Sequence, residues 1–125
     1  LWAKDALEQG KKLNIIDDQY RSPTLAEDLA DACISSFKNL KFGIYNVSGK
    51  DFMSIYEIVE RIAKYYCYST KMLNRISTDT LNQKAQRPKK TGFIIDKAAK
   101  ELGYNPNSFE ECLKIIDKQL ENNLK

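Results

Sequence analysis

The sequence predicts an α/β fold of about four to five helices and a few short strands. Helix-capping patterns precede apolar stripes that recur at the helical period. Between these stripes lie short runs of β-branched and aromatic residues, which are typical of strands. The predicted strands are too few and too short for a free-standing doubly wound sheet. We therefore expect that part of the sheet is missing or that a dimer completes it.

The first elements are a helix and a strand. Residues 2–9 follow a helical pattern that stops at Gly10. Because this pattern is already under way at residue 2, we expect the natural chain to begin upstream. Residues 13–16 are an apolar run suited to a strand.

A capping box at Thr24 and Glu27 predicts the next helix. Its expected apolar face carries Leu25, Leu29, Cys33 and Phe37, with Ala30 and Ile34 beside them. Residues 42–47 are rich in aromatic and β-branched residues, and we expect them to form a strand.

A second capping box, at Ser54 and Glu57, begins a helix with an apolar stripe. Residues 72–76 are a candidate short strand. Residues 77–95 show no clear period, which predicts a loop with one helical turn at most.

Two helices are expected near the C-terminus. Asp96 is the expected cap of a short helix that ends at Gly103. Ser108 and Glu111 form a third capping box. The apolar face of the last helix consists of Phe109, Cys112, Leu113, Ile116 and Leu120.

Composition narrows the class of protein. The 125 residues suit one domain or a piece of a larger one, and a net charge of +3 is too mild to indicate nucleic-acid binding. There is no histidine, the commonest metal ligand, and no metal is expected. No two of the three cysteines are spaced like a redox or zinc pair. We therefore expect reduced, mostly buried thiols in a cytoplasmic protein. No run is long enough to span a membrane.

The sequence lacks the familiar nucleotide and catalytic motifs. Its five glycines never form the closely spaced pattern of a dinucleotide-binding turn, and no P-loop is present. None of its seven tyrosines is followed four residues later by a lysine, the pair that short-chain dehydrogenases use for proton transfer. We therefore predict that this chain is inactive on its own.

Two arginine–proline segments carry the strongest functional signal. Residues 17–24 read Asp-Asp-Gln-Tyr-Arg-Ser-Pro-Thr, and residues 85–88 read Ala-Gln-Arg-Pro. A rigid turn that holds a guanidinium group suits a phosphate or a carboxylate.

A longer ordered series includes both segments. It consists of Asp18-Gln19, Ser22-Pro23-Thr24, Asp28-Leu29-Ala30, residues 43–49, residues 54–57, Ala85, Arg87-Pro88 and residues 100–104. This series resembles the C-terminal, substrate-binding part of the dTDP-4-dehydrorhamnose reductase family. That family belongs to the extended short-chain dehydrogenase/reductases, together with sugar-nucleotide epimerases and dehydratases.

The resemblance implies that residues 1–125 are a single substrate-binding domain, the C-terminal lobe of a longer NAD(P)-dependent enzyme of deoxysugar or polysaccharide precursor biosynthesis. The absent N-terminal Rossmann part would bind NAD(P) and supply the catalytic residues. By position, Arg21 and Arg87 correspond to arginines that grip the diphosphate of a nucleotide sugar in related epimerases. Gln19 and Lys89 are weaker candidates for sugar or phosphate contacts.

Several alternatives stay open. Rhamnose-type reductases commonly have glycine where Arg21 stands, and arginine there is also similar to the non-catalytic β subunit of methionine adenosyltransferase. A regulatory or binding module of the same fold is therefore the second interpretation. Arg21 could instead pair with Asp17, Asp18 or Asp28, and the basic residues around Arg87 could be a solvated face. A homodimer is possible, whereas nucleic-acid and membrane partners are not expected.

Overall fold

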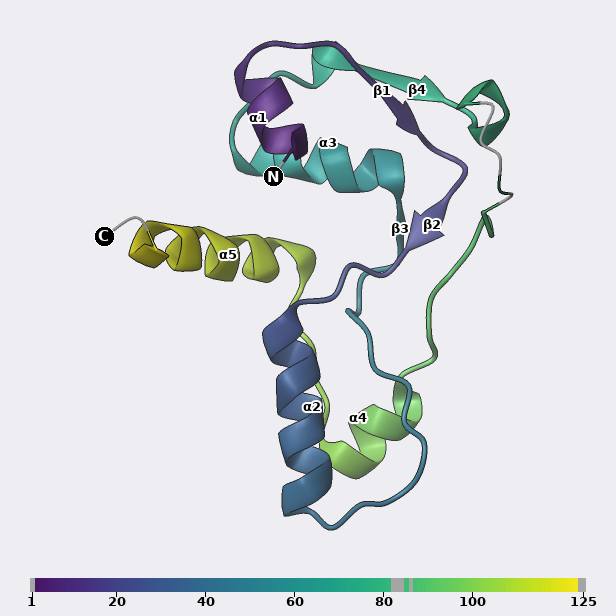
Figure 1. The fold of residues 1–125 in the computed structure, drawn as a ribbon, viewed down its shortest axis with the longest axis vertical. Coiled ribbons are helices and arrows are strands. Elements are labelled where there is room, and N and C mark those ends of the chain that lie inside the picture. Colours follow the sequence, from purple (N-terminus) through teal and green to yellow (C-terminus); the bar gives the residue numbers. More distant parts are fainter. Residues whose placement is uncertain (1, 82–84, 86, 124–125) are drawn as a thin grey trace. The chain divides into compact units, whose positions relative to one another are not determined.

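The computed structural model describes residues 2–81, 85 and 87–123 (Figure 1). These residues form five α-helices and four short strands, which confirms the predicted α/β class with few, short strands. The chain divides into two compact units. Unit 1 comprises Leu1–Arg21 and Met53–Thr91, and unit 2 comprises Ser22–Phe52 and Gly92–Lys125.

Unit 1 has two helices and a parallel strand pair. Helix α1 (Trp2–Glu8) packs against α3 (Ile55–Tyr65), which also contacts β1 (Leu13–Ile16). Strand β1 pairs in parallel with β4 (Leu73–Ile76), and the two run side by side in Figure 1. The predicted helix at 2–9 and both predicted strands are confirmed, β4 beginning one residue later than expected.

The core of unit 1 joins α1, α3 and β1. Its buried residues are Ala3, Leu7, Ile15, Tyr56, Val59 and Ala63. The predicted capping box of α3 is present. Glu57 N donates to Ser54 Oγ at 3.1 Å, and Ser54 N donates to Glu57 Oε2 at 2.7 Å.

A second, smaller sheet in unit 1 positions the first arginine–proline segment. Strand β2 (Tyr20–Arg21) pairs antiparallel with β3 (Met53–Ser54), and Tyr20 also forms a parallel bridge with Lys90. Two 3-10 helices, η1 (Thr70–Met72) and η2 (Thr78–Leu81), flank β4. Helix η2 is the turn expected in the loop that follows β4; residues 82–84 and 86 of that loop lie outside the described residues.

Unit 2 consists of three helices and long connections. Helix α2 (Ala26–Lys38) packs on α4 (Asp96–Leu102), and α5 (Phe109–Asn123) follows. The buried core consists of Ala32, Ala98, Leu102 and Tyr104. Helix α4 ends as predicted at Gly103, which has a φ of 68°. The prediction that Asp96 caps α4 is wrong, because the N-cap is Ile95 and Asp96 is the first helical residue.

The predicted strand at 42–47 is wrong. Tyr45 and Val47 pack against the core of unit 2, whereas Phe42 and Ile44 are each 86% exposed. Within the described residues no strand lies beside this segment, so its backbone has no ladder to join. The strand-like composition therefore lacks the partner that strand pairing requires.

The predicted apolar face of α2 is also wrong, except at its N-cap residue Leu25, which is buried. The buried residues of this helix are Asp28 and Ala32, while Phe37 is 82% exposed. Contact with α4 therefore selects a different face from the one that hydrophobicity favours.

The Thr24–Glu27 capping box is absent. The N-cap residue of α2 is Leu25, and no side chain caps this helix. Thr24 Oγ1 instead accepts a hydrogen bond from Gly49 N at 2.8 Å and donates to Ser22 O at 3.0 Å. The side chain that the sequence assigns to a cap thus holds together two loop segments.

The cysteines are free thiols, but they are not mostly buried as predicted: Cys33 and Cys67 are exposed, and Cys112 is buried. Cys33 is exposed because α2 turns a different face toward α4 from the one predicted. Cys67 follows the end of α3 and has a φ of 58°. Among the helices that the structure describes, none is long and apolar enough to cross a membrane.

Candidate functional site

The site begins with the guanidinium group of Arg21, which β2 places next to the second arginine–proline segment. Arg21 Nη1 donates to Tyr20 O at 2.6 Å and to Pro88 O at 3.1 Å. Arg21 Nη2 donates to Gln19 Oε1 at 2.9 Å. These contacts occupy at most three of the five N–H donors of an arginine.

Gln19 lies beneath this arginine and is 3% exposed. Its Oε1 accepts from Arg21, and its Nε2 donates to Thr78 Oγ1 at 3.0 Å. Its backbone oxygen accepts from Ile55 N at 2.9 Å, which anchors it to the start of α3. Both ends of the side-chain amide are therefore hydrogen-bonded within the protein.

Asp18 completes the network from the other side. Its Oδ1 accepts from the Thr78 hydroxyl at 2.6 Å and from Thr78 N at 3.0 Å. The hydroxyl bond is the main reason that the pKa of Asp18 lies below its ordinary value, and the backbone bond and the charge of Lys89 act in the same direction against a desolvation that raises it. Asp18 is thus held as a carboxylate, and the hydroxyl proton of Thr78 points away from Gln19.

The second segment is joined to Tyr20 by backbone hydrogen bonds. Tyr20 N donates to Lys89 O at 2.6 Å, and Thr91 N donates to Tyr20 O at 3.1 Å. With the bond from Arg21 to Pro88 O, these contacts bring the two arginine–proline segments together, although 67 positions separate Arg21 from Pro88. All of them lie in unit 1.

The predicted site residues occupy different environments. Arg21 is half-buried and Gln19 is buried, whereas Arg87 and Lys89 are exposed. Among the described residues, no hydrogen bond or ion pair engages the Arg87 side chain. Lys90 lies with its Nζ 5.6 Å from the centroid of the Tyr20 ring.

Among the residues that the structure describes, no carboxylate forms an ion pair with the guanidinium group of Arg21. These residues include Asp17, Asp18 and Asp28, the three candidates for such a pair. The Asp18 carboxylate instead accepts the hydrogen bond from the Thr78 hydroxyl. A guanidinium group held by neutral oxygen atoms keeps its full charge and can bind an anion. No group of three or more potential metal ligands occurs among the described residues.

Sequence reasoning missed Thr78, which links Asp18 to Gln19. Thr78 lies 60 positions from Asp18, at the first residue of η2, and the sequence around it has no recognisable motif. No local signal in the sequence could have identified it, because its role depends on the parallel pairing of β1 with β4, which brings the residues after both strands together.

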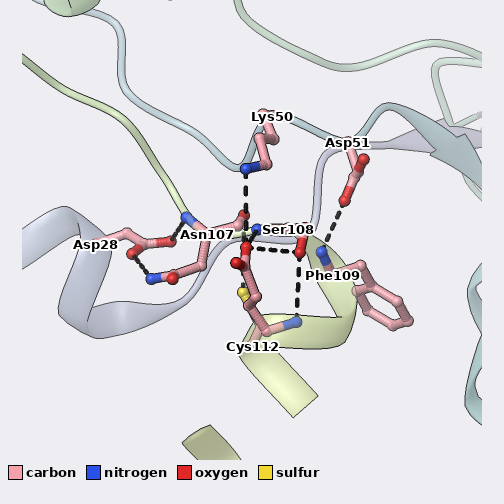
Figure 2. Close-up of polar contacts among 8 residues, drawn as sticks. Asp28, Lys50, Asp51, Asn107, Ser108, Phe109 and Cys112 are labelled. Carbon is pink, nitrogen blue, oxygen red and sulfur yellow. Dashed lines mark hydrogen bonds and ion pairs between the residues drawn. The ribbon is translucent and has the colours of Figure 1, made fainter. Parts of the chain in front are cut away.

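A different polar cluster, in unit 2, supports the beginning of α5 (Figure 2). The Asp28 carboxylate, which is buried, accepts from Asn107 N at 3.1 Å and from Asn107 Nδ2 at 2.6 Å. Asp51 Oδ2 accepts from Phe109 N at 2.7 Å. The predicted Ser108–Glu111 capping box is present, with Ser108 N donating to Glu111 Oε2 at 2.7 Å and Glu111 N donating to Ser108 Oγ at 3.4 Å. These groups fix loops to a helix end, and we assign them a structural role.

Unit 2 also has an apolar cavity of about 340 Å³ between the start of α2 and α5. Its lining includes Leu25, Phe109, Leu113 and Ile116. The predicted face of α5 is therefore partly buried and partly lines this cavity: Phe109, Cys112 and Leu113 are buried, and Ile116 and Leu120 are half-buried.

Known proteins share this architecture. The chain is 32% identical over 107 residues to the spore coat polysaccharide biosynthesis protein SpsK of Bacillus subtilis (strain 168), a match that covers 86% of this chain and 37% of that protein. A dTDP-4-dehydrorhamnose reductase from Clostridium acetobutylicum ATCC 824 superposes with a TM-score of 0.84, at 20% identity over 96% of this chain and 42% of that one. The reductase from Bacillus anthracis str. Ames, solved with NADP, gives a TM-score of 0.80, at 23% identity over 94% and 42%.

A more distant likeness extends to an epimerase. The UDP-glucuronic acid 4-epimerase from Bacillus cereus, solved with UDP-glucuronic acid and NAD, gives a TM-score of 0.65, at 23% identity over 90% of this chain and 36% of that one. The chain thus spans about two fifths of the length of the proteins that it matches. The family model described as the RmlD substrate binding domain matches residues 3–122. The chain therefore belongs to the RmlD substrate-binding domain family, within the extended short-chain dehydrogenase/reductases.

Proposed function

We propose that this domain binds a nucleoside-diphosphate sugar of the dTDP-4-keto-sugar type and that Arg21 and Arg87 grip its diphosphate. In this proposal the domain works within a longer NAD(P)-dependent reductase or epimerase of deoxysugar or polysaccharide precursor biosynthesis. The observation that carries the proposal is the meeting of the two arginine–proline segments, in which Arg21 donates to the carbonyl oxygen of Pro88.

The physical chemistry of the site suits a diphosphate. A diphosphate has several anionic oxygens, which match the guanidinium group of Arg21, held by neutral oxygen atoms, and the exposed guanidinium group of Arg87. Arg87 precedes Pro88 directly, so the two arginines emerge from segments in contact. Lys89 and Lys90 add positive charge on the same segment.

The relatives support the same ligand class. The epimerase from B. cereus was solved with a UDP-sugar, and the reductase from B. anthracis was solved with NADP. The family name of the domain refers to substrate binding. We propose that hydride passes between nicotinamide and a 4-keto sugar elsewhere in the longer protein, and that this domain supplies affinity and orientation.

Replacement of the arginines tests the proposal. In the protein that carries this domain, Arg21→Ala and Arg87→Ala should each weaken dTDP-sugar binding by about 1.5–3 kcal/mol, because each removes hydrogen bonds to a charged group. Isothermal titration calorimetry measures the effect.

Lys11→Ala is the matched control. It removes one positive charge from unit 1 at the opposite end of β1, and it should leave the affinity unchanged. Unchanged affinity in both arginine variants would mean that these residues are structural. A protein that binds the sugar nucleotide through both arginines but turns over no substrate would favour the regulatory module.

A further inference from the structure

We infer that Gln19, Thr78 and Asp18 form a positioning relay that fixes the direction of the Arg21 guanidinium group and do not themselves contact the ligand. This inference rests on the proposed function, because it assigns a role to the residues behind the proposed anion-binding arginine. It also replaces the expectation that Gln19 contacts sugar or phosphate directly.

The burial of Gln19 supports a positioning role. Gln19 is 3% exposed, and both its amide oxygen and its amide nitrogen are used inside unit 1. With 3% of its surface exposed, Gln19 offers a ligand almost no surface to contact. Gln19 is therefore placed to act on Arg21, whose side chain is more exposed.

The directions of the hydrogen bonds also support this role. The Asp18 carboxylate can only accept, so the Thr78 hydroxyl must donate to it. The oxygen of that hydroxyl then accepts from Gln19 Nε2, which turns Gln19 Oε1 toward Arg21. Each hydrogen bond fixes the direction of the next one. The Asp18 carboxylate therefore orients the Arg21 guanidinium group through Thr78 and Gln19, without an ion pair between Asp18 and Arg21.

The relay holds Arg21 through an uncharged amide and not through a carboxylate. A carboxylate in direct contact with Arg21 would hold the guanidinium group but would also compete with an anionic ligand for it. An uncharged amide holds the group in one direction while leaving its charge available. The Pro88 carbonyl oxygen, also uncharged, acts from the other arginine–proline segment.

The first experiment needs no ligand. NMR measures the rate of rotation about the Cζ–Nη bonds of Arg21 in the 125-residue chain, and hydrogen bonds to Nη slow this rotation. Gln19→Met, which keeps the size of the side chain but removes its polar atoms, should increase the rate about three- to tenfold. Thr78→Val should increase it as well, and Thr78→Ser should restore the slow rate because serine keeps the hydroxyl.

Asn74→Ala is the matched control. It removes another side-chain hydrogen bond of unit 1, from Asn74 Nδ2 to Asn14 Oδ1 at 2.9 Å, and should leave Arg21 unchanged. Equal rotation rates in the wild type and in folded Gln19→Met would overturn the relay. If Gln19→Met does not fold, the Thr78→Val and Thr78→Ser pair decides the question in the same way.

The second experiment is a double-mutant cycle with dTDP as the ligand in the protein that carries the domain. Gln19→Met should weaken dTDP binding about three- to tenfold when Arg21 is present and should have no effect in an Arg21→Ala background. Equal effects in both backgrounds would overturn the relay, because Gln19 would then act independently of Arg21. If Arg21→Ala itself leaves dTDP binding unchanged, the proposed function fails, and the rotation rates still decide the relay.

Discussion

Arg21 shows how a residue at the surface depends on buried neighbours. Its position in β2 comes from pairing with β3, and its contacts come from Gln19 and from the carbonyl oxygen of Pro88. The sequence identified Arg21, Gln19, Arg87 and Lys89 as candidates. It could not distinguish the buried Gln19 from the exposed Arg87 and Lys89, because burial there depends on contacts between residues about 60 positions apart.

The lowered pKa of Asp18 makes the stability of the folded protein depend on pH. The pKa is lowered in the folded protein, so the contribution of Asp18 to stability is fully present above the ordinary value of 3.8 and is lost as the pH falls through the lower, folded value. Thr78→Val should raise the pKa of Asp18 toward its ordinary value and weaken this dependence. A carbon-detected NMR titration of the Asp18 carboxyl, compared between the two proteins, provides the measurement; an identical pKa in both would contradict the assignment.

The surroundings of Gly49 leave no room for a side chain. A Cβ atom at this position would lie 1.9 Å from the backbone oxygen of Pro23, which cannot move without shifting the loop. Gly49→Ala should therefore lower the free energy of unfolding by about 1–3 kcal/mol in urea denaturation. Gly92→Ala is the comparison: its Cβ would meet the half-exposed ring of Phe52 at 2.9 Å, and a ring can turn away. An equal loss in both variants would argue against the steric explanation.

At the scale of elements, local sequence signals predicted helices, strands and caps correctly where a segment determines its own structure. The helix ending at Gly10, the strand at 13–16 and the capping boxes at Ser54 and Ser108 are all present. The predictions that failed depend on a neighbour. Residues 42–47 have a strand composition but no adjacent strand among the described residues, and α2 turns an alanine toward α4 where larger apolar residues were expected.

Two of the predicted capping boxes, one present and one absent, lead to a direct comparison. Ser54→Ala removes the bond that Glu57 N donates and should lower the free energy of unfolding by about 1 kcal/mol, with increased amide exchange in the first turn of α3. Thr24→Ala should leave exchange in the first turn of α2 unchanged, because Thr24 bonds to Gly49 and does not cap that helix. Faster exchange at the start of α2 in Thr24→Ala would contradict this account.

At the scale of the whole molecule, the α/β class and the family were predictable because ordered motifs survive along the chain. Several of those motifs now have physical roles. Thr24 receives the hydrogen bond of Gly49, and the buried Tyr104 donates to Ser48 O at 3.0 Å, so motif residues from three segments meet in unit 2. The way in which residues 17–21 and 88–91 come together could not be predicted, because it depends on a parallel bridge between Tyr20 and Lys90, which are distant in the sequence.

Exposed apolar residues in unit 2 predict self-association of the isolated chain. Phe37, Leu40, Phe42 and Ile44 are between 71% and 86% exposed, which is unusual for a monomeric protein. Size-exclusion chromatography with light scattering should show dimers or larger species whose proportion rises with concentration. The variant Phe42→Ser/Ile44→Ser should shift this equilibrium toward the monomer, and a wild-type chain that is monomeric at all concentrations would contradict the prediction.

The central claim is that Arg21 and Arg87 form one diphosphate site, and an NMR titration with dTDP tests it most directly. Titration of the 125-residue chain with dTDP should shift the guanidinium signals of both Arg21 and Arg87 along a single binding curve, whereas thymidine, which has no phosphate, should shift neither. Signals of both arginines that stay in place, in a titration that shifts other residues of the chain, would contradict the claim.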